Sequence, residues 1–309
     1  MLRSLLMVLL LALPATAAER TVKVFLLAGQ SNMEGHGFYK AEEKRNGGKG
    51  SLEDAVKNGP NKEAYKHLVD KAGQWVVRDD VFVHYAMKNR KGKLTVGYGV
   101  GPDTIGPELG FGHVVGDAFE EPVLLVKLCW GGKSLGKDFR PPSAGAEVGA
   151  YYKEVVDRSK AILKDLKSEF PEFGDAKPEL VGFGWHQGWN DRVNQPFVDE
   201  YESNMVHFIR DIRKDLDAPK LPFVIAETGM GGVNEKHPRA IKLMKAQENA
   251  ANRAEFQGNV AFVGTKAFWR ESDAAPSKQS YHWNSSGATY FEIGDAMGKA
   301  MLKLCGKGK

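Results

Sequence analysis

The chain of 309 residues is 42% hydrophobic and 27% charged, a globular composition that excludes a disordered, collagen-like or coiled-coil protein. Its formal net charge of +4 is small for this length, so charge gives no indication of a nucleic-acid partner. The only two cysteines, Cys129 and Cys305, exclude a disulfide-stapled scaffold and a cysteine-based zinc site. We expect Cys129, directly after an apolar strand, to be a core thiol, because a strand buried beneath helices disfavours a disulfide to the tail.

The first residues have the order of charge and hydrophobicity that is typical of a secretory signal peptide. Arg3 precedes an apolar run over residues 5–13, and the small residues at 15–17 fit a cleavage site. The run is shorter than the about 20 residues that a membrane-spanning helix needs. We therefore expect a signal peptide over residues 1–17 and one mature domain over residues 18–309, periplasmic or secreted and without a membrane anchor.

Five short runs have the length of strands and are almost continuously apolar. Continuous apolar runs indicate strands that are covered on both faces, as in a parallel sheet between helices. The runs lie at residues 22–28, 122–128, 180–185, 222–227 and 259–265.

Helical patterns lie between or after these runs, with apolar residues at steps of three and four. The alternation of strand and helix predicts a three-layer α/β/α sandwich around a mostly parallel five-stranded sheet, with its site at the carboxyl ends of the strands. The predicted helices cover residues 107–119, 151–170, 196–216, 238–256 and 285–304.

One stretch interrupts this alternation and is predicted to be an insertion, over residues 35–106. Within it, residues 75–86 and 93–99 alternate apolar and polar side chains on either side of the sequence NRKGK, which indicates an inserted antiparallel hairpin. The insertion leaves the carboxyl end of the first strand. It would thus either shape access to a site there or be a surface decoration, which long loops allow at little cost in stability.

A serine follows the first predicted strand. Ser31 stands two residues after Gly29, as in the G-x-S-x-G nucleophile elbow, although Met33 occupies the position of the second glycine. At a strand end, such a serine is either a nucleophile or the N-cap of a helix.

Three further polar segments follow predicted strands or precede the last helix. The Gly-Gly turn at 131–132 allows backbone N–H groups to approach an anionic oxygen, whereas a P-loop is excluded because Lys127 replaces the glycine that this motif requires. Residues 184–191 (GWHQGWND) gather an imidazole, an amide and a carboxylate. His282 is a loop histidine just before the last helix, either a base or a surface residue.

Together these segments resemble the SGNH-hydrolase superfamily and, within it, the sialate O-acetylesterase-like domains of the carbohydrate esterase family 6 type. The resemblance spans residues 22–304 and implies a flavodoxin-like α/β/α fold. It is carried by GQSNM at 29–33, the turn at 131–132, WHQG at 185–188 with Asp191, His282 and IGPELGF at 105–111.

The resemblance implies an acyl-transfer site without a metal or other cofactor. Ser31 would be the nucleophile and His282 the general base. The oxyanion hole would consist of the N–H groups of Ser31 and Gly132 and the side chain of Gln187. Each donor of this kind contributes about 2.7–4 kcal/mol to lowering the barrier.

The sequence departs from the family at the position of the orienting acid, because Gln279 stands where an aspartate commonly precedes the histidine. Glu227, at the end of the fourth predicted strand, is the favoured substitute, since catalytic groups collect at strand ends in this fold. Asp191, Asp273 and a Ser–His dyad without an acid are the alternatives. Glu227 could equally stabilise the glycine-rich turn that follows it.

The family motif WHQGESD is WHQGWND in this chain, which would alter the sugar subsite. Asn32, Trp189 and Asp191 are predicted to shape the substrate site, because aromatic faces beside polar groups suit sugar rings. We expect a secreted serine O-acetylesterase that deacetylates a glycan, either sialic acid or a polysaccharide. The alternatives are a glycan-binding protein on an inactive esterase scaffold and an esterase for non-sugar substrates.

Overall fold

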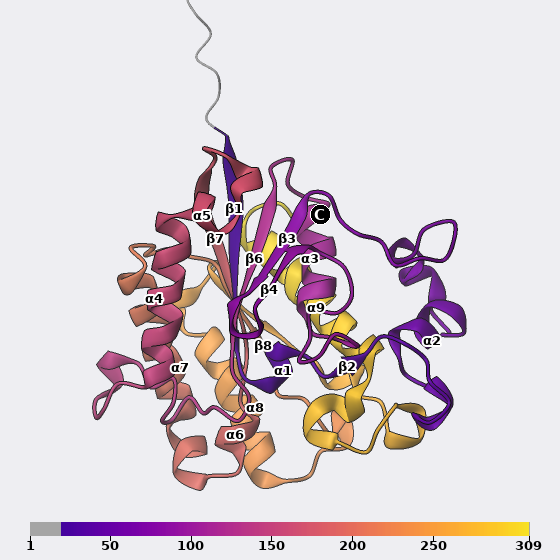
Figure 1. The fold of residues 1–309 in the computed structure, drawn as a ribbon. Helices are drawn as coiled ribbons and strands as arrows, with labels where there is room; N and C mark the ends of the chain where they lie inside the picture. Colours follow the sequence, from indigo (N-terminus) through magenta and orange to yellow (C-terminus); the bar gives the residue numbers. More distant parts are fainter. Residues whose placement is uncertain (1–19, 309) are drawn as a thin grey trace, which may run out of the picture.

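The computed structural model describes residues 20–308, so the predicted signal peptide lies outside the described residues. A seven-stranded sheet in the order β4-β3-β6-β1-β7-β8-β9 forms the centre of the protein (Figure 1). All its neighbouring strands are parallel except β3 and β4, which are antiparallel. The strands are β1 (Thr21–Gly29), β3 (Val81–Tyr85), β4 (Arg90–Lys93), β6 (Val123–Cys129), β7 (Lys177–His186), β8 (Phe223–Ala226) and β9 (Val260–Val263).

Helices cover both faces of this sheet, which confirms the predicted three-layer sandwich (Figure 1). Side chains of β1 show the two faces, because Leu26 belongs to the core beneath α4, α7 and α8, whereas Leu27 belongs to the core beneath α3 and α9. The helices are α1 (Ser31–Glu34), α2 (Leu52–Lys57), α3 (Glu108–Gly116), α4 (Ala150–Lys164), α5 (Leu166–Glu169), α6 (Trp189–Arg192), α7 (Gln195–Asp215), α8 (Pro238–Ala251) and α9 (Gly287–Leu304).

The predicted strand count of five is too low, because the hairpin of the insertion joins the central sheet. Strand β3 pairs in parallel with β6, and β4 pairs antiparallel with β3. The expected turn at residues 89–93 is wrong, since most of it forms β4. The alternating sequence of β3 suggested a strand with one face in solvent. Four of its five residues are in fact buried, because β3 packs beside β6 inside the sheet. The charged β4 suits an exposed edge.

The rest of the insertion packs against the start of α9. The short strands β2 (Gly37–Phe38) and β5 (Thr104–Ile105) pair with each other, and α2 contacts α9. The Tyr65 hydroxyl donates a hydrogen bond of 2.5 Å to Glu292 on α9. A surface decoration would make no such contacts, so the insertion is part of the structural support around the last helix.

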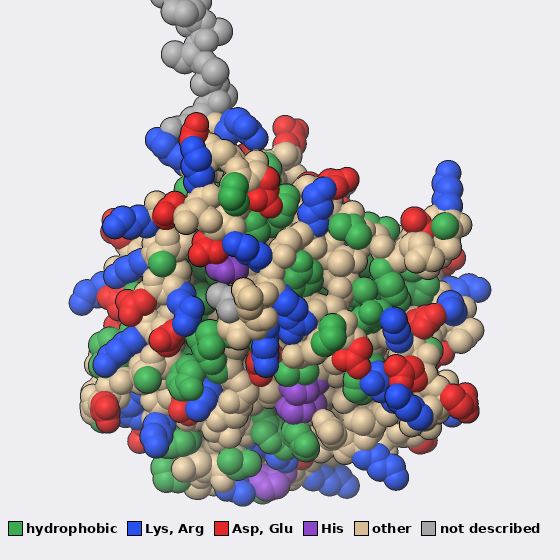
Figure 2. Space-filling view, in the orientation of Figure 1, with side chains coloured by type: hydrophobic (Ala, Val, Ile, Leu, Met, Phe, Trp, Pro, Cys, Tyr) green, Lys and Arg blue, Asp and Glu red, His purple; other side chains and the backbone are tan. Residues whose placement is uncertain are grey.

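Acidic and basic side chains are interspersed over the face shown in Figure 2, in keeping with the small net charge. Cys129 is buried and Cys305 is partly buried, and both are free thiols. Among residues 20–308, no helix combines the length and hydropathy that a membrane crossing requires.

Candidate active site

The predicted motifs meet where β1, β6 and β7 end. In the sheet register, Gly29 at the end of β1 lies opposite Cys129 of β6 and His186 of β7. The carboxyl ends of neighbouring parallel strands share one edge of a sheet, so the segments that follow these three residues are brought side by side.

A close approach of two strands places Ser31 at this edge. Gly29 has a φ of +149°, and a Cβ atom there would lie 2.3 Å from the carbonyl oxygen of His186, so only glycine fits. The Gln30 side chain then accepts hydrogen bonds of 3.1 Å from the N–H groups of Gly188 and Asn190. Gln30, not Ser31, is the N-cap residue of α1, which leaves the Ser31 hydroxyl free for another partner.

That partner is His282. Its Nε2 lies 3.0 Å from Ser31 Oγ, although the two residues are 251 positions apart in the chain. Ser31 is only 7% exposed, and burial lowers the pKa of His282 to about 4, so the imidazole is neutral at pH 7. A neutral imidazole at this distance can accept the hydroxyl proton, as a general base must.

The backbone around His282 has an unusual conformation. His282 lies in a 3-10 segment, Ser280–Ser285, that is distorted from His282 onward. Trp283, Asn284 and Ser285 follow with φ values of +52°, +50° and +58°, three consecutive residues in the left-handed region that non-glycine residues rarely adopt. Such strain persists only where the surroundings over-determine the conformation, and it is concentrated at functional sites.

The insertion supplies much of that support. The Asn46 side-chain amide donates hydrogen bonds to the carbonyl groups of Ser272, Asp273 and Ala275, which precede the histidine segment. On the other side, the Ser286 hydroxyl donates to the carbonyl of Gly50 at 2.8 Å. The insertion therefore holds both flanks of the segment that carries His282.

Asn32 adds a link from α1, the helix that carries Ser31. Its amide nitrogen donates to the carbonyl of Tyr281 at 3.1 Å, and its oxygen accepts from the Tyr290 hydroxyl at 2.7 Å. Asn32 is 2% exposed. Asn32 was predicted to shape the substrate site; in the structure its contacts fix the histidine segment to α1.

The structure brings none of the three predicted acids to His282. Within residues 20–308, no carboxylate forms an ion pair with it, and its Nδ1 faces the side-chain oxygen of Gln279 at 3.4 Å. Glu227 turns toward β9 instead, accepting from the N–H of Thr265 at 2.9 Å and pairing with Lys266 at 3.0 Å. Through these contacts Glu227 holds the segment that follows β9. Among the described residues its carboxylate accepts no hydrogen bond from the glycine-rich turn at 229–232, the alternative that we considered.

Asp191 and Asp273 also lie elsewhere. Asp191 is fully buried and accepts hydrogen bonds from the N–H groups of Leu135 and Gly136 at 2.9 and 2.8 Å. Burial raises its pKa to about 6. The carbonyl of Asp273 binds Asn46. Asp191 thus fixes the loop after β6 and has no exposed surface.

The loop after β6 places two glycines near Ser31. A Cβ atom on Gly131 would lie 3.9 Å from Ser31 Cβ, and Gly132 is exposed with a φ of +68°. Within the described chain, the N–H groups of Ser31 and Gly132 donate no hydrogen bond, so both remain available to an oxyanion. The Gln187 amide differs, because it donates to the carbonyl of Lys133 at 2.9 Å and to Asp191 at 2.5 Å.

Comparison with protein families agrees with this geometry. A family model described as carbohydrate esterase, sialic acid-specific acetylesterase, matches residues 21–303. The chain belongs to this esterase family. It is therefore a carboxylic ester hydrolase, and the family favours a carbohydrate acetyl ester as its substrate class. A comparison with curated proteins gives no significant match.

Solved structures show the same fold at low sequence identity. A protein from Arabidopsis thaliana is 18% identical with a TM-score of 0.58, and the match covers 91% of this esterase and 97% of that chain. NanS is 16% identical with a TM-score of 0.56, covering 94% and 99%. A carbohydrate acetylesterase from Xanthomonas citri is 13% identical with a TM-score of 0.51, covering 91% and 56%.

The structure adds two aromatic residues of the esterase that the motifs did not indicate. Tyr281 is 43% exposed, and its ring lies 4.5 Å from that of His282 and 6.1 Å from that of the half-buried Trp189. His36 stacks on His282 with 3.6 Å between ring centroids. Tyr281 could have been noticed as the neighbour of the predicted base, whereas nothing in the sequence connects His36 with a residue 246 positions away.

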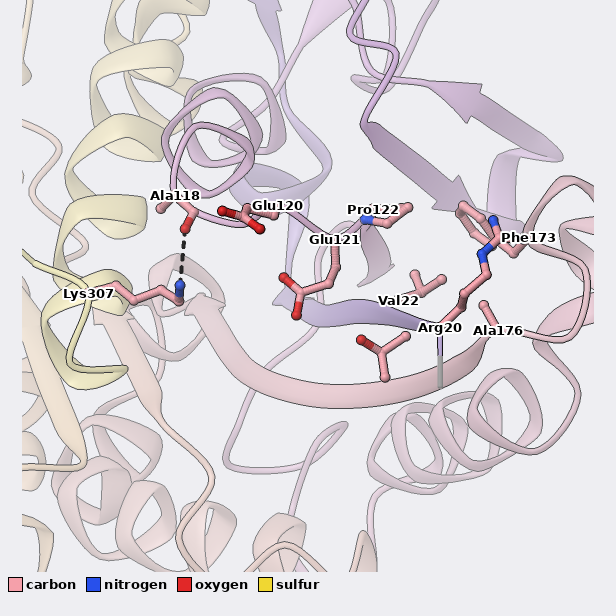
Figure 3. Close-up of a pocket in the computed structure, with 10 residues that line it drawn as sticks. Arg20, Val22, Ala118, Glu120, Glu121, Pro122, Phe173, Ala176 and Lys307 are labelled. Atoms are coloured by element: carbon pink, nitrogen blue, oxygen red, sulfur yellow. Dashed lines mark hydrogen bonds between the residues drawn. The ribbon is translucent and has the colours of Figure 1, made fainter. Parts of the chain in front are cut away.

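A hollow of about 610 Å³ lies at the opposite edge of the sheet, where β1 begins and β6 is about to begin (Figure 3). It is lined by the charged side chains of Arg20, Glu120, Glu121 and Lys307, and Lys307 donates to the carbonyl of Ala118. None of the predicted site residues lines it. We assign it no role in ester hydrolysis, because Ser31, the predicted nucleophile, is at the other end of the strands.

Proposed function

We propose that this esterase is a secreted serine O-acetylesterase that removes acetyl groups from a glycan through an acetyl-serine intermediate. The observation that carries the proposal is the 3.0 Å contact between Ser31 Oγ and a neutral His282 Nε2 at the carboxyl edge of the sheet. Secretion rests on the signal-peptide pattern of residues 1–17.

In the proposed cycle, His282 accepts the proton of Ser31 as Oγ attacks the acetyl carbonyl. The tetrahedral intermediate collapses, and the imidazolium gives its proton to the departing sugar hydroxyl. Water then attacks the acetyl-serine, with His282 taking a proton from it and returning that proton to Ser31 Oγ. Acetic acid leaves and the starting state is restored.

The negative charge on the carbonyl oxygen would be stabilised by the N–H groups of Ser31 and Gly132, which are free within the described chain. Gln187, predicted as a third donor, has its amide committed to Lys133 and Asp191. We therefore assign Gln187 and Asp191 the task of holding the glycine loop in place. Donors that are fixed before the reaction stabilise the transition state without the cost of reorganisation.

A carbohydrate is the proposed leaving group because of the aromatic side chains beside the base. Tyr281 and Trp189 form a wall next to His282, and aromatic faces pack against the C–H faces of sugar rings. Arg192 lies over the Trp189 ring at 4.2 Å and orients it.

The decisive experiment measures acetate release from a panel of acetylated sialic acids and polysaccharides. Ser31→Ala and His282→Ala should each lower kcat by about 10³-fold or more. Ser203→Ala, on the exposed side of α7, is the matched control and should behave as the wild type. A fluorophosphonate probe should label folded wild-type protein and the control but not Ser31→Ala.

Two outcomes would contradict the proposal. Wild-type protein that binds glycans without releasing acetate and without labelling at Ser31 would be a binding protein on an esterase scaffold. A preference for long-chain esters over acetyl esters would show a non-sugar substrate instead.

A further inference from the structure

A second histidine packs flat against the proposed base. The rings of His36 and His282 are stacked with 3.6 Å between centroids and 14° between planes. His36 follows α1, only five residues after Ser31, so one short segment carries both the nucleophile and a ring that contacts the base.

The backbone on either side of His36 is fixed. Gly35 has a φ of +95°, and a Cβ atom there would lie 2.1 Å from the Cα atom of Gly106. Gly37 pairs with Ile105 in the small β2–β5 sheet. His36 therefore has little freedom to move away from the ring that it covers.

Hydrogen bonding does not account for the presence of His36. Its side chain is partly buried, and its Nε2 is buried without a hydrogen-bond partner among the described residues. Burial, with the charges of Lys88, Lys127 and a protonated His282, lowers the pKa of His36 to about 3. The ring is therefore neutral, and its face is the part that contacts another functional group.

The surroundings of His282 show what this face can contribute. Ser31 Oγ contacts the Nε2 atom of His282, and the side-chain oxygen of Gln279 lies 3.4 Å from its Nδ1 atom. The Tyr281 ring packs edge-on against the imidazole. In an ordinary triad, a carboxylate orients the imidazole and stabilises the imidazolium that forms during attack. Among the described residues, no carboxylate is placed to orient the His282 imidazole or to stabilise its positive charge.

We propose that His36 is the positioning residue of this site: its stacked, neutral ring holds His282 toward Ser31 and stabilises the positive charge that develops on it. The inference rests on the proposed Ser31–His282 chemistry. A ring face attracts a nearby cation through its π electrons, and the attraction grows when water is excluded, as it is between stacked rings. His36 does not touch the reacting atoms and transfers no proton.

The test compares His36→Phe with His36→Leu in the full chain, since both side chains fill the space but only phenylalanine has a π face. We expect His36→Leu to lower kcat about tenfold or more with KM nearly unchanged, because in this proposal the ring of His36 acts on His282 and not on the bound substrate. His36→Phe should retain most of kcat. In His36→Leu the acid limb of kcat/KM should also move to lower pH, because the dry imidazolium has lost its stabilising partner.

His67→Leu is the control, because His67 is an exposed histidine of the insertion whose ring contacts other aromatic rings, those of His113 and Phe291, and not that of His282. It should lower the melting temperature without moving the acid limb. Equal kcat in the Phe and Leu variants of His36, or an unmoved acid limb in His36→Leu, would overturn the positioning role. If Ser31→Ala retained acetate release, the proposed function itself would fail, which is a separate result.

Discussion

The burial of His282 determines the pH range in which this esterase should work. A general base must be neutral, and the pKa of His282 is lowered to about 4 by desolvation. Activity should therefore be retained as the pH falls below the ordinary histidine value of 6.5 and be lost only through about pH 4. The measurement is kcat/KM for acetate release between pH 3.5 and 8.

Unfolding at acid pH could imitate this loss, so circular dichroism should be recorded at each pH as a control. A folded protein that loses activity between pH 6 and 7 would show that water reaches the imidazole, contrary to the structure.

Asp191 should couple the stability of the site to pH in a definite direction. Burial raises its pKa from 3.8 to about 6, so the folded state binds this proton more tightly than the unfolded chain does. The contribution of Asp191 to the free energy of unfolding is therefore fully present below about pH 4. It is lost as the pH rises through about 6.

Asp191→Asn removes this titration and points an amide N–H group at the N–H donors of Leu135 or Gly136. We expect a loss of about 1–3 kcal/mol in the free energy of unfolding, larger at pH 4.5 than at pH 7.5, together with a lower kcat because the glycine loop shifts. Urea unfolding at the two pH values measures it, with the exposed Asp199→Asn as control. A difference that grows with pH would contradict the argument.

At the level of single residues, the sequence could indicate Ser31 and His282 because they belong to motifs tied to strand or helix ends. It could not decide between an orienting acid and a Ser–His dyad without one. Glu227 does lie next to a strand end, but which neighbour its side chain contacts depends on the segment that follows β9, whose backbone supplies the N–H of Thr265. The stacking of His36 is likewise a contact between segments far apart in the chain.

Among the elements, the insertion should stabilise the segment that carries His282, the proposed base. Asn46 has a φ of +54°, so Asn46→Gly removes the side chain without backbone strain. The change deletes the hydrogen bonds to three carbonyl groups and should cost about 1–2 kcal/mol. It should also lower kcat several-fold, because His282 would leave its productive position more often.

Asn89→Gly is the matched control, since Asn89 has a φ of +48° in the hairpin turn and lies on the surface. It should leave both kcat and melting temperature nearly unchanged. Identical behaviour of the two variants would mean that the insertion does not support the histidine segment.

The five predicted strands and five predicted helical segments were recognised because long buried elements have strong patterns. The sequence also predicted the β3–β4 hairpin, but it did not predict that this hairpin joins the central sheet. The sequence VFVHY fits either an exposed hairpin or a buried strand, and only the available edge of β6 decides between them.

Over the whole molecule, the buried Lys127 connects the sheet, the Ser31 helix α1 and the insertion. It extends from β6, is 0% exposed, and donates to the carbonyls of Glu34 and Tyr98 at 2.7 Å and to the carboxylate of Glu108 at 2.8 Å. These partners come from α1, from the loop after β4 and from α3. One ammonium group therefore holds together three parts that the chain order separates.

Lys127→Met should consequently weaken stability and activity together. It leaves the Glu108 carboxylate buried without its ion partner, which costs about 3–5 kcal/mol when one member of a buried pair is removed. It also frees the carbonyl at the end of α1, close to Ser31. The melting temperature and the rate of acetate release should both fall, whereas exposed Lys299→Met on α9 should change neither.

The double variant Lys127→Met, Glu108→Gln removes the unpaired charge and should recover part of the lost stability. It should not recover kcat fully, because Glu34 and Tyr98 still lack their donor. Full activity in the single variant would show that the Ser31 helix α1 is held without Lys127.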